Sequence, residues 1–205
     1  MAHLEVEVKF ILDDVPEMRR QLVAAGGESE GRWFESNLVF DDPEYRLTES
    51  GRLLRLRRDR KVRLTFKRPS AQTQEGFKVL EELEVNVDDF ETMRRILESL
   101  SYRPQLRYEK WRETFRLGDA LACVDTLPYG SFLELETSDP DVLRSVAHTL
   151  NLPWERRIVW NYHRIFEEIR SAYSLPFSDI TFERFETLDI DLHAIRQRIE
   201  EGARG

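Results

Sequence analysis

The chain has 205 residues, of which 40% are hydrophobic and 34% charged, and it carries a formal net charge of −8. This length and apolar content predict one domain, or one domain with an appendage, and the negative charge argues against general adhesion to nucleic acid. The only cysteine, Cys123, cannot form an intrachain disulfide. No apolar run approaches the length of a membrane span and no apolar signal segment opens the chain, so we expect a cytoplasmic protein that does not enter a membrane.

The first predicted strand alternates charged and apolar residues. Successive side chains of a strand point to opposite faces, so Glu5, Glu7 and Lys9 share one face and apolar residues share the other. Three ionised groups on one strand face belong in water or in a wet cavity. A second Glu-x-Glu strand, with Glu134 and Glu136, lies near the end of the core. This repetition favours the cavity.

Helices and strands alternate through the middle of the chain. Asp13 and Asp14 can cap a helix that runs to about Ala25, and Asp88 and Asp89 can cap a second one. A third helix is expected over 139–150. Strands are predicted over 33–40, 52–58, 62–68, 77–87, 107–117, 120–126 and 131–137, with a polar loop at 69–76.

The pattern changes from Pro153 onward. Apolar residues near helical spacing predict a helix over 154–173. An aromatic-rich stretch over 174–191 shows no regular period, and 188–201 is a candidate for the last helix.

About eight strands in hairpin-like order predict an α+β fold, a closed eight-stranded antiparallel β-barrel with helices packed outside. A barrel of this size can hold one small ligand. The charged strand faces would then line the lumen, which inverts the usual sandwich with its polar face outward. Alternation alone does not decide between the two arrangements. The three amphipathic helices favour the barrel, because its apolar outside offers them a surface to cover.

Basic residues gather between the two acidic strands. From Arg52 to Arg68 the chain has nine lysines and arginines against a single acid, Asp59. A local cation cluster in an acidic protein indicates a specific anionic ligand, although plain surface charge explains Arg58, Arg60, Lys61, Arg63 and Arg68 equally well. Paired carboxylates and paired cations on strands together indicate a site where metal ions and a polyanion meet.

In chain order these motifs resemble the CYTH domain, also called the triphosphate tunnel metalloenzyme family. Its signature Glu-x-Glu-x-Lys strand is matched by residues 5–9. The further matches are Arg55 and Arg57, then Lys67 before Pro69, Lys110 and Arg112, Asp125, and finally Gly130, Phe132, Glu134 and Glu136. The spacing and the turn at 125–130 look most like the branch that contains class IV adenylyl cyclases and thiamine triphosphatases.

The resemblance implies a role for each matched residue. A small-molecule triphosphate is expected to bind the basic residues Lys9, Arg55, Arg57, Lys67, Lys110 and Arg112. The cofactor, Mg²⁺ or Mn²⁺, is expected on Glu5, Glu7, Asp125, Glu134 and Glu136. The catalytic set is Glu5, Glu7, Lys9, Glu134 and Glu136. Glu82 and Glu84 have two alternative roles, as further metal ligands or as salt-bridge partners of the basic residues in the tunnel. The salt-bridge role is slightly better supported.

The matched motifs span about residues 3–165, so we assign a tunnel domain to 1–173 and a C-terminal helical extension to 174–205. The extension matches no motif of the family. It either covers an end of the tunnel or forms the contact of a homodimer.

The nucleophile decides the product. Attack by water on the terminal phosphorus would give a triphosphatase, the leading hypothesis, whereas attack by a ribose 3′-hydroxyl on the α-phosphorus would give an adenylyl cyclase. A non-catalytic sensor of polyphosphate or nucleotide is a third hypothesis, but it would gain little from four lumen carboxylates. No residue reads adenine unambiguously. The tryptophans are expected in the core, unless one lies at a tunnel mouth, where it can stack on a base.

Overall fold

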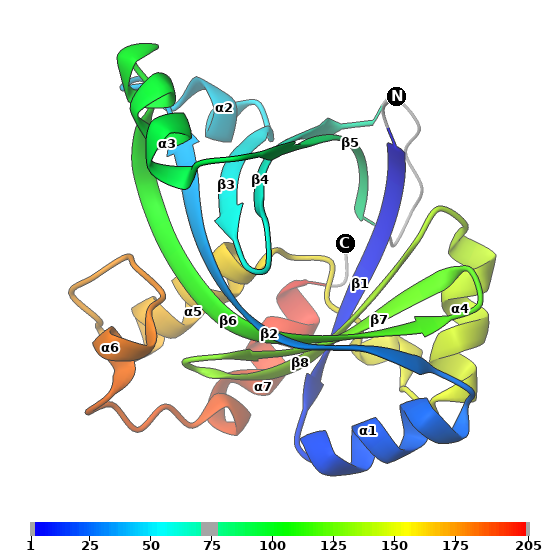
Figure 1. Cartoon of the computed structure of the whole chain (residues 1–205). Coiled ribbons are helices and arrows are strands. Elements are labelled where there is room, and N and C mark those ends of the chain that lie inside the picture. The colour runs from blue at the N-terminus through cyan, green and yellow to red at the C-terminus, as the bar shows by residue number, and fades with distance from the viewer. Residues whose placement is uncertain (1–2, 71–77, 204–205) are drawn as a thin grey trace.

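A computed structural model describes residues 3–70 and 78–203 of the chain. Its eight antiparallel strands form a closed barrel in the spatial order β1-β5-β4-β3-β2-β6-β7-β8 (Figure 1). The strands are β1 His3–Leu12, β2 Glu28–Asp41, β3 Leu53–Arg58, β4 Val62–Pro69, β5 Lys78–Val87, β6 Arg103–Leu117, β7 Ala120–Leu127 and β8 Gly130–Thr137. The predicted α+β fold with a closed eight-stranded barrel is confirmed. The polar loop expected at 69–76 lies mostly outside the described residues.

Strand β1 closes the barrel by pairing with β5 on one edge and with β8 on the other. In the pairing with β8, Glu7 lies opposite Glu136 and Lys9 lies opposite Glu134. Residues directly opposite each other in an antiparallel pair have their side chains on the same face. The two Glu-x-Glu motifs, at opposite ends of the core sequence, therefore meet side by side on the inner face.

Two strands are longer than predicted. β2 begins at Glu28 instead of residue 33, and β6 begins at Arg103 instead of residue 107. They pair with each other along almost their whole length. Residues 28–32 are mostly polar and show no alternation, so their extended conformation comes from pairing with β6 rather than from local preference.

Three helices pack against the apolar outside of the barrel, α1 Val15–Ala24, α3 Phe90–Ser99 and α4 Pro140–Thr149 (Figure 1). α1 and α4 share an apolar cluster with β1, β7 and β8, and α3 shares another with β2 and β3. Each helix begins at a capping aspartate whose side chain accepts a backbone N–H from the first turn; Asp14 and Asp89 were predicted as caps, and Asp139 caps α4 in the same way. No helix in residues 3–70 and 78–203 is long and apolar enough to cross a membrane.

The helix predicted over 154–173 is wrong in its first half. Residues Trp154–Arg156 form one 3₁₀ turn, and Ile158 then makes a β-bridge with Lys9. Helix α5, Tyr162–Tyr173, begins where the Asn161 side chain accepts the N–H of Arg164. Periodic apolar residues are not enough for a helix when the backbone finds a strand partner instead.

The last helix also starts later than predicted. α7 spans Leu192–Gly202, and the side chain of Asp191 caps it, so residues 188–190 remain outside. Two single-turn helices, α2 Arg46–Glu49 and α6 Phe182–Phe185, were not predicted. Four residues carry too little periodic signal for a prediction from sequence.

The C-terminal segment covers one end of the barrel. α5, α6 and α7 share a large apolar cluster with the start of β6 and with the turn between β7 and β8 (Figure 1). Tyr129 of that turn stacks on Phe166 with ring centroids 6.1 Å apart. Of the two roles expected for the tail, covering an end of the tunnel is the one that this packing supports. The division at residue 173 stays a prediction.

Candidate active site

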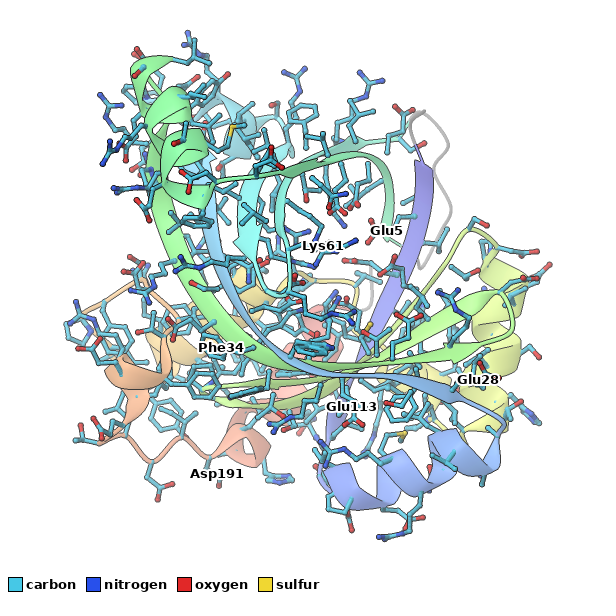
Figure 2. The ribbon with its side chains drawn as sticks, in the orientation of Figure 1. Glu5, Glu28, Phe34, Lys61, Glu113 and Asp191 are labelled. Atoms are coloured by element: carbon cyan, nitrogen blue, oxygen red, sulfur yellow. The ribbon has the colours of Figure 1, made fainter. Side chains whose placement is uncertain are left out.

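The inside of the barrel holds a cavity of about 470 Å³ with a highly charged lining. Figure 2 shows side chains filling the space within the ring of strands, with Glu5 on β1. All the predicted site residues except Asp125 line this one cavity; they are Glu5, Glu7, Lys9, Arg55, Arg57, Lys67, Lys110, Arg112, Glu134 and Glu136. Strand alternation is the reason, because every second residue of each strand faces the lumen.

Most glutamates of the cavity lie on β1, β5 and β8, which we call its acidic side, and two lysines form ion pairs with them. Lys9 Nζ lies 3.0 Å from Glu7 Oε1 and 3.1 Å from Glu134 Oε2. Lys67 Nζ lies 2.5 Å from Glu5 Oε2 and 2.7 Å from a carboxylate oxygen of Glu82. Burial lowers the pKa of Lys9, but its two carboxylate neighbours outweigh burial and hold that pKa above its ordinary value. Burial likewise lowers the pKa of Lys67, but the charges of Glu5 and Glu7 outweigh burial and raise that pKa. Both lysines are therefore charged at neutral pH.

Negative charge remains in excess on this side. Burial, together with the neighbouring carboxylates Glu7 and Glu136, raises the pKa of Glu5 to about 8, although Lys67 opposes the change. Burial and the charge of Glu134 likewise raise the pKa of Glu136. A bound cation would stabilise the ionised form of these crowded carboxylates.

The donor set on this side fits a hard divalent cation. Mg²⁺ and Mn²⁺ prefer carboxylate oxygens, and four glutamates of β1 and β8 supply them. Within the described residues, no three acidic, histidine or cysteine side chains already converge as ligands. Three of the four glutamates are instead paired with lysines: Lys9 bridges Glu7 and Glu134, and Lys67 holds Glu5. These carboxylates would have to turn from the ammonium groups toward a metal.

Glu35 of β2 was missed by the sequence prediction and sits among the cations. Its carboxylate lies 3.4 Å from Arg57 Nη1 and 3.7 Å from Lys110 Nζ. Burial raises its pKa, but Arg57 and Lys110 outweigh burial and hold the pKa well below its usual range. The signal was available, because Glu35 lies on a predicted strand whose lumen face had not been assigned.

Among the described residues, Arg55 is the one buried cation of the lining that forms no ion pair. It is 8% exposed, and no carboxylate of the described residues lies within ion-pair distance of it. Its Nη1 donates to Tyr108 Oη at 3.1 Å and its Nη2 reaches Thr65 Oγ1 at 3.5 Å, while its buried Nε has no hydrogen-bond partner in the described part of the chain. A buried charge without an ion-pair partner is costly. This guanidinium is therefore prepared for an anion.

Tyr108, also missed, completes the basic side. It is buried on β6 with its hydroxyl against Arg55. Burial would raise the pKa of the phenol, but the charges of Arg55, Arg57 and Lys110 outweigh burial and lower it to about 8. An acidic phenol beside three cations is a good hydrogen-bond donor to an anionic ligand.

Asp125 lies behind the lining and is fully buried. Its carboxylate accepts hydrogen bonds from Lys110 Nζ at 2.9 Å, from Arg112 Nε at 2.7 Å and from Tyr162 Oη at 2.7 Å. Both carboxylate oxygens are engaged, so this geometry favours a role in positioning Lys110 and Arg112. The metal-ligand role of Asp125 stays a prediction.

Tyr162, at the start of α5, is a cavity residue contributed by the C-terminal part of the chain. Besides its bond to Asp125, its ring lies 5.2 Å from Lys9 Nζ and 5.0 Å from Lys110 Nζ, measured to the ring centroid. A cation over a tyrosine face is attracted by the ring. Nothing local in the sequence marked Tyr162, because its place depends on the docking of α5 against the barrel end.

The cavity thus combines a cluster of buried cations, one of which, Arg55, has no carboxylate partner among the described residues, with carboxylates that crowd one another. Guanidinium and ammonium groups match phosphate oxygens, and a carboxylate cluster matches a divalent cation. This arrangement can bind a polyphosphate and a metal ion next to each other.

Known proteins share this sequence and fold. The sequence profile of the CYTH domain matches residues 3–151. A protein of Methanocaldococcus jannaschii, named provisionally as an adenylate cyclase, is 31% identical over 141 residues, which are 68% of this chain and 79% of that protein.

Solved structures agree with the match. A structure from Vibrio parahaemolyticus, also named provisionally as an adenylate cyclase, has a TM-score of 0.71 at 22% identity and covers 82% of this chain and 99% of that one. HpAC1 from Hippeastrum, an adenylyl cyclase by provisional name with a dominant triphosphatase activity, has a TM-score of 0.55 at 17% identity, over 84% of this chain and 96% of that one. Since the profile covers most of the chain, the chain belongs to the CYTH family.

Proposed function

We propose that this chain is a divalent-metal-dependent triphosphatase that cleaves a small triphosphate inside the barrel. The observation that carries the proposal is Arg55, a buried guanidinium that lacks a carboxylate partner among the described residues and faces a cavity with crowded glutamates on its other side. The triphosphatase activity of the Hippeastrum neighbour supports the same reading.

The basic side would bind the phosphate groups. Arg55 and Arg57 are forked donors that match phosphate oxygens, and Lys110 of β6 adds a point charge to the same cavity. Tyr108 would donate its hydroxyl proton to a phosphate oxygen while it accepts a hydrogen bond from Arg55. These groups are already fixed by strands, so they stabilise charge that develops on the leaving oxygen without reorganising.

The acidic side would hold the metal ion. Glu5, Glu7, Glu134 and Glu136 are the candidate ligands, and Lys9 and Lys67 would move from them to the phosphates when both ligands enter. When bound, Mg²⁺ or Mn²⁺ neutralises phosphate charge and activates the attacking water. Asp125 and Tyr162 keep Lys110 in place during the reaction.

Product analysis tests the proposal directly. Inorganic triphosphate, thiamine triphosphate and ATP are each incubated with the chain and Mg²⁺ or Mn²⁺, and orthophosphate, pyrophosphate and cyclic AMP are measured. We expect orthophosphate, and no release after chelation of the metal. Cyclic AMP with pyrophosphate would refute the triphosphatase, and no product from any substrate would leave a binding protein.

A matched pair of variants tests the role of Arg55. Arg58 lies on the same strand, but it is exposed on the outside, where its guanidinium covers the Phe90 ring at 4.8 Å. Losing a hydrogen-bond donor to a charged group costs about 1.5–3 kcal/mol, so Arg55→Gln should lower kcat/KM about 10-fold to 150-fold. Arg58→Gln should leave kcat/KM unchanged. Equal effects of the two variants would contradict the assignment.

The second candidate function is that of a class IV adenylyl cyclase, which converts ATP to cyclic AMP and pyrophosphate. The name of the M. jannaschii relative, at 31% identity, favours it. Both functions need the same charged lining, and the product analysis above separates them.

A further inference from the structure

Trp33 differs from the other aromatic side chains that line the cavity. Among the described lining residues the tyrosines and tryptophans are Trp33, Tyr108 and Tyr162. The two tyrosines are buried and hydrogen-bonded, whereas Trp33 is 42% exposed. A large exposed indole that borders a charged cavity has a use other than core packing.

The register of the barrel places Trp33 at an open mouth. Trp33 is two residues before Glu35 on β2, and it pairs across the strands with Arg112. It therefore faces the lumen one layer, roughly 6.6 Å, beyond Glu35 and Lys110. β2 runs antiparallel to β6, so the start of β2 lies at the opposite end from the start of β6, which the C-terminal helices cover. Trp33 thus stands at the end that those helices leave open.

The backbone next to Trp33 is shaped to hold the ring. β2 has a bulge between Ser29 and Gly31, and Gly31 has a φ of +101°. A Cβ atom on Gly31 would lie 3.1 Å from Trp33 Nε1. A side chain at position 31 would push the indole away, so the glycine lets the ring lie against the strand.

Arg60 covers the indole from the turn between β3 and β4. Its guanidinium lies 4.5 Å from the Trp33 ring centroid. Arg60 is exposed, and none of the described carboxylates forms an ion pair with it. The side chain can therefore lift from the ring at little cost, and its planar head can stack on the far side of an inserted ring.

We propose that Trp33 is a stacking platform for the aromatic ring of the substrate, so that the chain acts on triphosphates with an aromatic group in preference to inorganic triphosphate. This inference rests on the proposed binding of the triphosphate among Arg55, Arg57 and Lys110. The ring would lie between Trp33 and Arg60 at the open mouth, with the phosphates directed into the barrel. Nucleoside triphosphates and thiamine triphosphate share this chemistry.

Trp111 offers a matched control. It is on β6, 37% exposed, and covered by the guanidinium of Arg32 at 4.6 Å. It faces the outside, where its ring meets Phe34 at 5.3 Å, and it does not line the cavity. The two tryptophans therefore match in exposure and in arginine stacking and differ in the side of the barrel that they face.

The test compares kcat/KM for ATP, thiamine triphosphate and inorganic triphosphate in the wild type, Trp33→Ala and Trp111→Ala. Loss of a stacked ring should lower kcat/KM for one or both aromatic substrates about 5-fold to 150-fold. The value for inorganic triphosphate should change less than about 2-fold, and Trp111→Ala should change none of the three. An equal loss on all substrates, or no loss on any, would overturn the proposal.

Two further measurements keep this test separate from that of the proposed function. If the wild type turns over none of the substrates, the proposed function fails, and titration calorimetry with ATP and with inorganic triphosphate still measures stacking. Trp33→Ala should then weaken ATP binding alone, and parallel weakening would overturn the inference. If Trp33→Ala does not fold, Trp33→Leu keeps apolar volume without a ring and should give the same selective loss, with Trp33→Phe restoring it.

Discussion

Replacing Asp125 by asparagine separates a positioning role from a metal-ligand role. The substitution keeps the shape and removes the charge that Lys110, Arg112 and Tyr162 share. Breaking a buried ion pair costs about 3–5 kcal/mol. Each cation keeps a second carboxylate, because Lys110 lies 3.7 Å from Glu35 and Arg112 lies 2.5 Å from Glu134. We therefore expect the lower end, a loss of about 3 kcal/mol in the free energy of unfolding.

For a chain of this size, such a loss lowers the melting temperature by about 6–12 °C. Urea and thermal unfolding in the presence of a chelator measure the loss without any contribution from metal. Added inorganic triphosphate should raise the melting temperature of Asp125→Asn more than that of the wild type. The reason is that Lys110 and Arg112 have lost one carboxylate partner in the variant. Asp119→Asn, in the exposed turn between β6 and β7, is the control and should change neither quantity.

The opposite result is equally clear. If Asp125→Asn melts at the wild-type temperature and loses only metal-dependent turnover, Asp125 is a metal ligand and the positioning role is wrong. A variant that binds triphosphate more weakly than the wild type, in the absence of metal, would also refute the reasoning.

Three further predictions address the lining and the fold. The pKa of Tyr108 is lowered to about 8 in the folded chain, against an ordinary value of 10, so the folded state loses this proton at a lower pH than the unfolded state does. The free energy of unfolding should therefore gain nothing from Tyr108 below pH 8 and rise by about 2–3 kcal/mol between pH 8 and 10. Tyr108→Phe should lack this rise. Absorbance at 295 nm should follow that titration, and a wild-type phenol that titrates only near pH 10 would contradict it. Glu35→Gln should destabilise the chain by about 3 kcal/mol in urea unfolding, since Arg57 and Lys110 lose a buried partner; an unchanged midpoint would show that those cations need no compensation. Asp89→Ala removes the cap of α3 and should cost about 1 kcal/mol with turnover unchanged; a loss of turnover would tie α3 to the site.

The local sequence pattern was enough to predict that the charged residues of the first strand share one face. Glu5, Glu7 and Lys9 alternate on one strand, and alternation places them on one face whatever the rest of the chain does. Capping aspartates such as Asp14 were equally visible, because the cap and the helix it starts are neighbours in sequence.

The missed residues depend on contacts between distant parts of the chain. Glu35 belongs to the site because β2 lies next to β3 and β6, which bring Arg57 and Lys110 beside it. Tyr162 belongs to it because Ile158 pairs with the backbone of Lys9, roughly 150 residues earlier in the chain. Alternation on the predicted strand 33–40 indicates which residues share a face with Glu35, but a single sequence does not show which strands become neighbours. The bridge from Ile158 to Lys9 also explains why the helix predicted from residue 154 does not form there.

The segment after residue 151 forms part of the lining of the barrel cavity, although the family match ends there. Lys9 and Ile158 exchange backbone hydrogen bonds of 2.9 and 2.8 Å, and Ile180 bonds to the backbone of β6 at 2.8 Å. Backbone hydrogen bonds thus hold the last quarter of the chain against the strands that carry Lys9 and Lys110, and its Tyr162 lines the cavity. A protein cut at the end of the matched region, residue 151, would therefore lose part of the cavity lining and the backbone pairing that holds it in place.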